Sequence, residues 1–425
     1  MKTIAIDTET WLIAPGRLAP RLVCMSWATE TDSGLWSAKD APEALRTYLR
    51  DGYKVIGHNL AFDLGVMVQH DHTLLPVVWD AYDRDAFTDT MICEILRKIR
   101  DGHTKLDPIT GRRPNYSLSE LVARYIGKEV AGKSGEDAWR FQYQELDGVP
   151  LKKWPKKARD YAINDAVYTH KIYEKQFHDS VANLGEQVRN AWALHLMGAW
   201  GLRTDPNAVL ELKKKLVTKI RGAIGVLKNA GIYRQNGTKD LSVVKQRIKA
   251  AYGQNTPVTQ KGSISTSSAV LAKSGDPILE RLASISGDQK LLNTYIPVLE
   301  SGTERPINPR FNVLVDSGRT SCRSPNIQNQ PREGGVRECY VPRQGHLYVA
   351  ADYHVAELCS LAQVLLDKFD QSNMAEALQA GRELHLETAA GILNCTYDEA
   401  VSRHKKGDKE VKKARQLAKA ANFGF

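Results

Sequence analysis

The feature that most constrains the fold is the N-terminal run Thr3 to Ile6, which is apolar and β-prone and leads directly into Asp7 and Glu9. Alternate side chains of a strand point to the same face, so the two carboxylates are predicted to project together at the end of this strand. An Asp-x-Glu pair on a strand is usually a solvated face, so the pair by itself indicates little. It gains meaning from two further groups of residues.

Those groups follow in order along the chain. The segment Asn59 to Asp63 places an asparagine four residues before a third carboxylate, and Tyr161 stands four residues before Asp165. The second pair lies in an alanine-rich, helix-favouring stretch, where a four-residue step stacks the phenol beside the carboxylate on one helical face. Asn59 could instead cap a helix, and Tyr161 with Asp165 could be an ordinary surface pair. Assembly of all three groups by chance is much less expected.

Four carboxylates at these spacings suit the hydrolysis of phosphodiester bonds. Two Mg²⁺ or Mn²⁺ ions, typically ~3.5–4 Å apart, activate a water and neutralise charge on the attacking and leaving oxygens. Such hard cations take oxygen ligands, which carboxylates provide. We therefore predict a site for two Mg²⁺ (or Mn²⁺) ions.

The combined pattern resembles the three motifs of the tyrosine-containing DEDD 3′→5′ exonucleases. The resemblance implies an RNase H-like fold in which Asp7 bridges both metals, Glu9 and Asp165 complete one metal site, and Asp63 supports the other. It also implies that Tyr161 orients the attacking water, and Asn59 is assigned to DNA contact. Of the neighbouring residues, His58 is interpreted as a loop or core histidine, and Asp89 is at least as easily a helix cap as a cleft residue.

The basic composition favours a polyanionic partner, although an excess of basic residues is by itself a weak signal. Its 425 residues predict two or three domains, and 59 Lys and Arg against 49 Asp and Glu give a net charge of +10. The six cysteines form no CxxC pair, which indicates reduced thiols and a cytoplasmic protein, in the host cytoplasm if a phage encodes it. No signal peptide or apolar run of membrane-spanning length is seen, so no membrane partner is expected.

Hydrophobic patterning divides the chain. Strands are predicted at 3–6, 22–28 and 54–57 and helices at 117–125 and 158–175, with an exposed loop over 98–116. A long basic helical segment follows, containing Lys213, Lys214, Lys215, Lys219, Arg221, Lys245, Arg247 and Lys249. Such a segment is usually a solvated helix face, but the other motifs of this chain favour a role in DNA binding. The Ser/Thr-rich stretch 263–268 could contact phosphates or serve as a flexible linker.

The segment Gly318 to Pro331 resembles the Gly-Arg-x-Ser and Pro-Asn-x-Gln-Asn-x-Pro motif of family A DNA polymerases. Its polar side chains can donate to the minor-groove acceptors that every correct base pair presents. The resemblance implies that Arg319 lies near the primer terminus and new base pair. The predicted DNA-binding residues here are Arg319, Asn326, Gln328 and Asn329.

Two further segments resemble motif A of that family and its nucleotide-contacting histidine. A strand predicted over Leu347 to Ala351 delivers Asp352, which the resemblance makes the ligand of two catalytic metals. Glu357 is implied to pack against the sugar and help to exclude ribonucleotides, and His385 to lie near the incoming phosphates, although a surface histidine is equally expected. The residues 354–356 depart from the common Ser-Gln-Ile, which affects the expected sugar and template contacts.

The C-terminal residues resemble motif B, the nucleotide-binding fingers helix. Four-residue steps align Arg415, Lys419 and Phe423 on one face, giving two cations for a triphosphate and a ring to pack on the nucleotide. The alternative is a lysine-rich surface helix, an interpretation that suits the lysines just upstream. The following Gly424 strengthens the motif.

The resemblance extends to residues 197–205, which look like the opening of the polymerase region, and 290–295, which look like the base of the thumb. We therefore predict an exonuclease domain over 1–185, a mostly helical thumb-like domain over 186–310, and a partial palm and fingers over 311–425. The expected partners are single-stranded and primer-template DNA and dNTPs. A compact phage-type enzyme is the closest match.

The second catalytic carboxylate of the polymerase centre is expected downstream of motif B, beyond Phe425. We expect a C-terminal remainder or a partner fragment to provide it, in a split, truncated or intein-interrupted polymerase. Two alternatives stay open: a free-standing exonuclease with a basic nucleic-acid-binding domain, and a subunit that grips DNA and tethers a partner.

Overall fold

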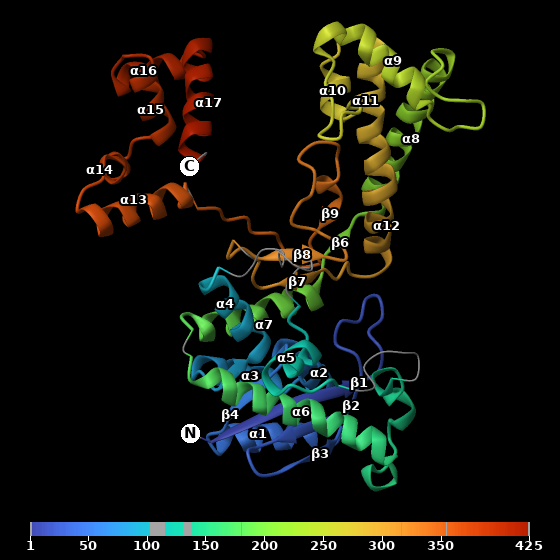
Figure 1. The fold of residues 1–425 in the computed structure, drawn as a ribbon, viewed down its shortest axis with the longest axis vertical. Helices are drawn as coiled ribbons and strands as arrows, with labels where there is room; N and C mark the ends of the chain where they lie inside the picture. The colour runs from blue at the N-terminus through green and yellow to red at the C-terminus, as the bar shows by residue number, and fades with distance from the viewer. Residues whose placement is uncertain are drawn as a thin grey trace. The chain divides into compact units, whose positions relative to one another are not determined.

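The computed structural model describes residues 2–102, 115–130, 138–179, 181–315, 317–353 and 355–423, with Phe423 described by its backbone alone. These residues form two compact units, Met1–Gly345 and His346–Phe425 (Figure 1). The predictions that concern residues 103–114, His354 and Gly424 lie outside the described residues.

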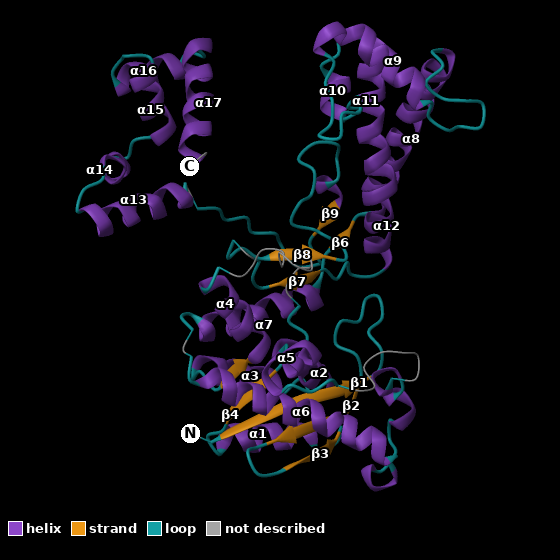
Figure 2. Ribbon diagram, in the orientation of Figure 1, coloured by secondary structure: helices purple, strands orange, loops and turns teal. Residues whose placement is uncertain are grey.

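A five-stranded mixed sheet organises the N-terminal part of the first unit (Figure 2). Its strands are β1 (Thr3–Thr10), β2 (Leu22–Ala28), β3 (Ser33–Ser37), β4 (Lys54–Gly57) and β5 (Phe87–Asp89), in the order β3-β2-β1-β4-β5. The β1–β2 and β2–β3 pairs are antiparallel, whereas β1–β4 and β4–β5 are parallel. This order agrees with the RNase H-like fold that the sequence predicts.

The side chains of β1 point alternately to the two faces of the sheet, and different helices cover these faces. Ile4 and Ile6 are buried in a core shared with α1 (Ala41–Arg50), α2 (Leu60–His70), α3 (Leu74–Asp83) and α7 (Leu184–Trp200). On the other face, α6 (Lys156–Phe177) packs on β1 and β2, and its Ala158 and Ala162 contact a core that includes Cys24. The small alanines let the helix approach the sheet closely. Asp7 and Glu9 therefore project toward α6.

Several shorter elements surround this sheet. They are α4 (Thr90–Arg100), α5 (Leu118–Ile126) and the 3₁₀ turns η1 (Trp139–Phe141), η2 (Tyr143–Leu146) and η3 (Leu151–Lys153). The strands predicted at 22–28 and 54–57 are formed with those bounds, while β1 runs four residues beyond the prediction, so Asp7 lies within the strand.

A mainly helical region follows α7. Its long helices α8 (Pro206–Asn229) and α11 (Pro277–Lys290) pack together and share a core with α9 (Leu241–Tyr252) and α10 (Ser268–Ala272). The 3₁₀ turn η4 (Gly253–Asn255) follows α9, and the π-helical turn η5 (Leu291–Tyr295) joins α11 to α12 (Ile296–Glu304). Short antiparallel pairs are formed by β6 (Arg203–Thr204) with β9 (Tyr340–Val341) and by β7 (Arg310–Asn312) with β8 (Ser321–Arg323), and η6 (Arg337–Cys339) precedes β9.

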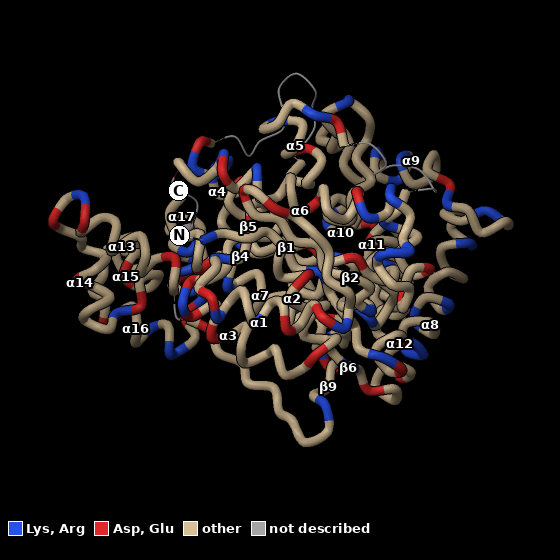
Figure 3. Tube along the Cα trace, turned by 90° about the horizontal axis from the view of Figure 1, so that it is seen from below, with Lys and Arg blue, Asp and Glu red and all other residues tan. Residues whose placement is uncertain are grey.

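Lysine and arginine recur along α8, α9 and α11 (Figure 3). Some of these cations pair with acids of the same region: Lys213 Nζ lies 2.6 Å from Glu300, Lys219 Nζ 2.8 Å from Asp288, and Arg247 Nη2 2.9 Å from Asp276. The basic helical segment is therefore helical as predicted, and part of its charge is used within the region.

The second unit contains five helices within its described residues: α13 (Ala356–Phe369), α14 (Asn373–Gln379), α15 (Leu384–Ile392), α16 (Tyr397–Lys405) and α17 (Lys409–Phe423). The strand predicted over Leu347 to Ala351 is wrong, because the described residues 344–353 form no strand. Leu347 and Val349 are 88% and 91% exposed. A strand needs a paired neighbouring strand, and none of the strand pairs among the described residues includes this segment.

Candidate active sites

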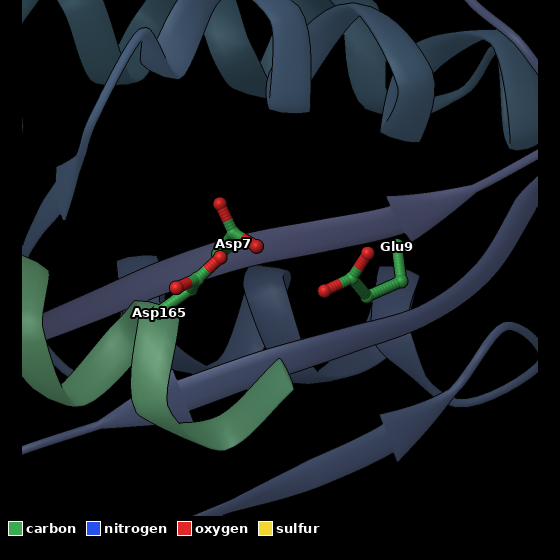
Figure 4. A group of neighbouring side chains, drawn as sticks. All are labelled: Asp7, Glu9 and Asp165. Carbon is green, nitrogen blue, oxygen red and sulfur yellow. The ribbon is translucent and has the colours of Figure 1, made fainter. Parts of the chain in front are cut away.

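Three carboxylates converge between β1 and α6 (Figure 4). One ligand oxygen from each of Asp7, Glu9 and Asp165 lies within 4.8 Å of the others. Glu9 and Asp165 are only 7% and 8% exposed, so this cluster is not an ordinary solvated face. Asp7 and Glu9 come from alternate positions of β1, and Asp165 reaches them from α6.

Asp63 does not belong to this cluster. It lies in the first turn of α2, and its Oδ1 accepts hydrogen bonds from the backbone N–H of Thr8 at 3.0 Å and from the Thr8 hydroxyl at 2.6 Å. Because Ala5 pairs with Ile56 near the end of β4, Thr8 lies beyond that end, and the parallel pairing of β1 with β4 does not use its backbone N–H. The Asp63 carboxylate accepts from this N–H. Burial raises the pKa of Asp63 to about 7, against the opposing effect of the Thr8 hydrogen bonds.

Asp89 performs the capping role that the sequence left open, and it caps two helices. Its Oδ1 accepts from Met91 N and Ile92 N in the first turn of α4, and its Oδ2 accepts from Leu60 N at the start of α2 at 2.7 Å. Asn59 occupies the N-cap position of α2 with φ at 70° but makes no side-chain cap hydrogen bond. Asp89 therefore caps the N-terminus of α2, the helix that carries Asp63. The Asn59 side chain does not cap this helix.

Tyr161 lies one turn before Asp165 on α6 and is half-buried. Its ring is 6.2 Å from that of Tyr143, whose hydroxyl donates to the Ala158 carbonyl at 2.7 Å. Burial and then the charge of Asp165 raise the pKa of Tyr161 above its usual range, so the phenol keeps its proton. His58, as expected, does not join the carboxylates: its Nδ1 lies 2.9 Å from Thr90 Oγ1.

Sequence reasoning missed two sets of side chains near the carboxylates. Trp11, Leu12 and Ile13 directly follow the end of β1 and are all exposed, a run of apolar residues that was visible in the sequence. The Trp11 indole donates to Asp147 at 2.9 Å, which holds the start of this loop.

The second set had no sequence signal. The Arg140 guanidinium stacks 4.4 Å above the exposed Phe141 ring, and its charge is close enough to oppose the rise in the pKa of Tyr161. This arrangement places a cation and an aromatic face on the side of the sheet that bears α6.

The carboxylate cluster fits a divalent cation. Three carboxylates at this separation repel one another unless a positive charge lies among them, and oxygen donors are the ligands of hard divalent ions. Asp7, Glu9 and Asp165 are therefore the residues that would hold such an ion.

Four of the five residues predicted to contact DNA line one pocket in the first unit, whereas Asn59 lies apart from it at the start of α2. Arg319, Asn326, Gln328 and Asn329 line an open pocket of about 390 Å³ beside β8. Asn326 Oδ1 accepts from the backbone N–H of Gln328 at 3.1 Å, and the Gln328 amide donates to the Thr320 hydroxyl at 2.8 Å. These contacts order the loop that carries the predicted minor-groove donors.

In the second unit, Asp352 is exposed in an extended segment, and Glu357 is exposed in the first turn of α13. His385 at the start of α15 is buried, and its Nδ1 lies 3.1 Å from the Asn422 amide nitrogen of α17. Burial lowers the pKa of His385; the charge of Glu383 opposes this effect, and the nearby cations Arg415 and Lys419 add to it. The structure thus brings His385 and the two cations of α17 together. The side chain of Phe423 lies outside the described part.

Family comparisons cover both parts of the chain. Residues 1–176 match the family of 3′-5′ exonuclease domains, and residues 212–425 match DNA polymerase family A. The second match covers half of the chain, and so the chain belongs to DNA polymerase family A. The predicted family and the predicted combination of an exonuclease domain with part of a polymerase domain are confirmed.

The relatives are bacterial enzymes. DNA polymerase I of Aquifex aeolicus is 24% identical over 87% of this chain, and the thermostable DNA polymerase I of Thermus aquaticus is 33% identical over 38% of it. The chain spans 60% of the length of the Aquifex protein and 19% of the Thermus protein. A phage origin stays a prediction, as do the domain boundaries at 185 and 310.

A solved structure shares the fold. The POL domain of Pol1 from M. smegmatis, in complex with a DNA primer-template and dNTP, aligns with 99% of this chain at a TM-score of 0.65 and 18% identity. The chain covers 67% of that structure. None of the helices in the described parts of the chain combines the length and hydropathy that a membrane span requires.

Proposed function

We propose that the N-terminal domain is a 3′→5′ exonuclease that removes nucleotides from single-stranded DNA ends and edits for a family A polymerase. The carboxylate cluster of Asp7, Glu9 and Asp165 carries this proposal, because two of its members are buried and all three converge between β1 and α6. The match of residues 1–176 to 3′-5′ exonucleases supports it. The ions we propose are two Mg²⁺ or Mn²⁺.

Each side chain has a stated task in this proposal. Asp7, Glu9 and Asp165 hold one ion, and Asp63, held against Thr8, supports the second from the edge of β1. Bound divalent ions would activate a water and neutralise charge on the phosphate oxygens. Tyr161 keeps its hydroxyl beside Asp165 and orients the attacking water by a hydrogen bond.

A single-stranded 3′ end would use the two sets of residues that the sequence reasoning missed. Exposed apolar and aromatic side chains give unpaired bases a surface on which to stack, and Trp11, Leu12 and Ile13 begin two residues after Glu9. Arg140 would pair with a backbone phosphate while its guanidinium remains stacked on Phe141. Asn59 is proposed to contact the same strand.

The test is the double variant Asp7→Ala with Glu9→Ala, assayed for release of nucleoside monophosphates from single-stranded DNA. We expect its activity to fall to the level of the EDTA-treated protein. A double variant of two exposed acids, Glu30→Ala with Asp160→Ala, removes the same charge and is expected to retain activity. Unchanged degradation by the Asp7/Glu9 variant would show that the site is wrongly assigned.

For the remainder of the chain we propose binding of primer-template DNA and dNTPs. Arg319, Asn326, Gln328 and Asn329 would contact the minor groove from their shared pocket. In the second unit, Asp352 is proposed to hold metal ions, Glu357 to contact the sugar, and His385, Arg415, Lys419 and Phe423 to bind the nucleotide. The match of residues 212–425 supports this assignment over a free-standing exonuclease.

DNA synthesis is proposed to need a second carboxylate from a C-terminal remainder or a partner fragment. The exposed, extended segment around Leu347 and Val349 supports the proposal, because its exposed apolar side chains suit packing against an added strand. Primer extension should occur only after a C-terminal family A fragment is mixed with the chain. Extension by the chain alone would contradict this proposal, and DNA binding without extension in the mixture would favour a DNA-gripping subunit.

A further inference from the structure

The pairing of α15 with α17 creates an ion pair that the motifs do not contain. Ala389 of α15 packs against Ala414 and Ala418 of α17, and these small side chains let the two helices approach closely. The approach brings Glu383, the N-cap of α15, beside Arg415 on α17. All of these residues belong to the second unit.

The Glu383 carboxylate makes two kinds of contact at once. Its Oε2 accepts from the backbone N–H of Leu386 at 3.0 Å, which caps α15, and from Arg415 Nε at 3.1 Å. Its Oε1 accepts from Arg415 Nη2 at 3.4 Å. The backbone of Glu383 is held as well, because its N–H donates to the Tyr397 hydroxyl at 2.8 Å.

The geometry of the pair decides what Arg415 can still do. A guanidinium has five N–H donors, and Glu383 engages it from the side, through Nε and Nη2. The N–H groups of Nη1 are not among those that Glu383 uses. An arginine held in this way can bind a phosphate with its far edge while the ion pair remains intact.

We infer that Glu383 is a positioning residue that holds Arg415 ready for the phosphates of an incoming nucleoside triphosphate, an inference that rests on the nucleotide-binding function proposed above. Arginine has a large conformational entropy, and a side chain that is ordered before binding loses less on binding. The opposing effect is repulsion between the Glu383 carboxylate and a triphosphate. Ordering of Arg415 by Glu383 would strengthen triphosphate binding, whereas repulsion by Glu383 would weaken it, so affinity measurements distinguish the two effects.

The experiment titrates inorganic tripolyphosphate and, separately, a dNTP into the whole chain by calorimetry. Glu383→Asp keeps a side chain that caps helices well but is one methylene shorter, so it loses contact with Arg415. We expect it to weaken tripolyphosphate binding by about 3- to 10-fold, the effect of leaving one long side chain unordered. Glu387→Gln is the control, since Glu387 lies on the same helix and pairs with Arg382 at 3.1 Å instead. It should bind as the unaltered chain does.

A double-mutant cycle separates positioning from a general loss of structure. In an Arg415→Ala background, Glu383→Asp should have no further effect on tripolyphosphate affinity, whereas damage to α15 would weaken binding in either background. Tighter binding by Glu383→Asp would overturn the inference, because repulsion would then dominate. If Arg415→Ala weakens binding and Glu383→Asp does not, only this inference is wrong. If the unaltered chain binds no tripolyphosphate, the proposed nucleotide site is wrong and the inference falls with it.

Discussion

Thr8 donates both its backbone N–H and its hydroxyl to one oxygen of Asp63, at 3.0 and 2.6 Å. Thr8 stands between Asp7 and Glu9, so a single strand presents two carboxylates on one face and fixes a third carboxylate from its edge. Thr8 thereby links the first motif of the exonuclease pattern to the second, although the Asp-x-Glu motif allows any residue at its position.

Replacement of Thr8 by valine should disturb Asp63 without altering the shape of β1. The variant keeps the backbone donor and loses a hydroxyl bond to a buried carboxylate, so we expect the free energy of unfolding to fall by about 2 kcal/mol. Nuclease activity should fall as well. Denaturant titration in EDTA and single-strand degradation measure the two effects.

Thr10→Val is the matched control, because the Thr10 hydroxyl donates only to the adjacent Trp11 carbonyl in an exposed position. If the two variants lose equal stability and activity, the Thr8–Asp63 contact has no special role.

Divalent ions should stabilise the folded chain through the carboxylate cluster. A ligand at about 100 times its dissociation constant adds about 2.7 kcal/mol, provided that it binds only the folded state. We expect Mn²⁺ to raise the melting temperature, and Asp165→Asn to remove most of the increase. Asp160→Asn, an exposed change on the same helix, should keep it. Full stabilisation of the Asp165 variant would place the bound ion elsewhere.

Gly65 is needed because α7 passes very close to α2. A Cβ added at Gly65 would lie 2.1 Å from His195 Nε2, so Gly65→Ala must displace the imidazole or the helix. We expect it to destabilise the fold by about 1–3 kcal/mol. Gly287 also lies within a helix but has open space around it, so Gly287→Ala should stabilise by about 0.5–1 kcal/mol. Thermal denaturation compares the two, and equal shifts would contradict the close contact.

His195 should make stability depend on pH. Its imidazole stacks on Trp192, and burial lowers the pKa of His195 from 6.5 to about 4. The folded state therefore binds fewer protons at His195 than the unfolded state, so the stability that this residue contributes is complete above pH 6.5 and is lost as the pH falls toward 4. The shift corresponds to at most about 3 kcal/mol.

Denaturant titrations between pH 7 and pH 4 test this dependence on pH. His195→Leu should remove this loss of stability at low pH and leave the opposite dependence that the raised pKa of Asp63 causes. The substitution breaks no hydrogen bond of Nε2 among the described residues. The same substitution at the exposed His72 is the control. A curve for His195→Leu as steep as that of the unaltered chain would assign the pH dependence to other groups.

Local sequence patterns correctly predicted several strands and helices of the first unit. The apolar runs at 22–28 and 54–57 are β2 and β4, and the helices predicted at 117–125 and 158–175 are α5 and α6 within two residues at each end. The strand at 347–351 has an equally β-prone sequence and does not form. β-propensity is a property of one segment, whereas a strand forms only when a second segment pairs with it through backbone hydrogen bonds.

The sequence by itself determined the family, the order of the motifs and the candidate metal-binding carboxylates, because these depend on residue type and spacing along the chain. Only the tertiary structure decided that Asp63 bonds to Thr8 rather than joining the cluster, that Asp89 caps two helices, and that Glu383 holds Arg415. Each of these contacts joins residues far apart in the chain. Hydrogen bonds between such residues depend on how helices and strands pack against one another, and spacing within a motif carries no information about that packing.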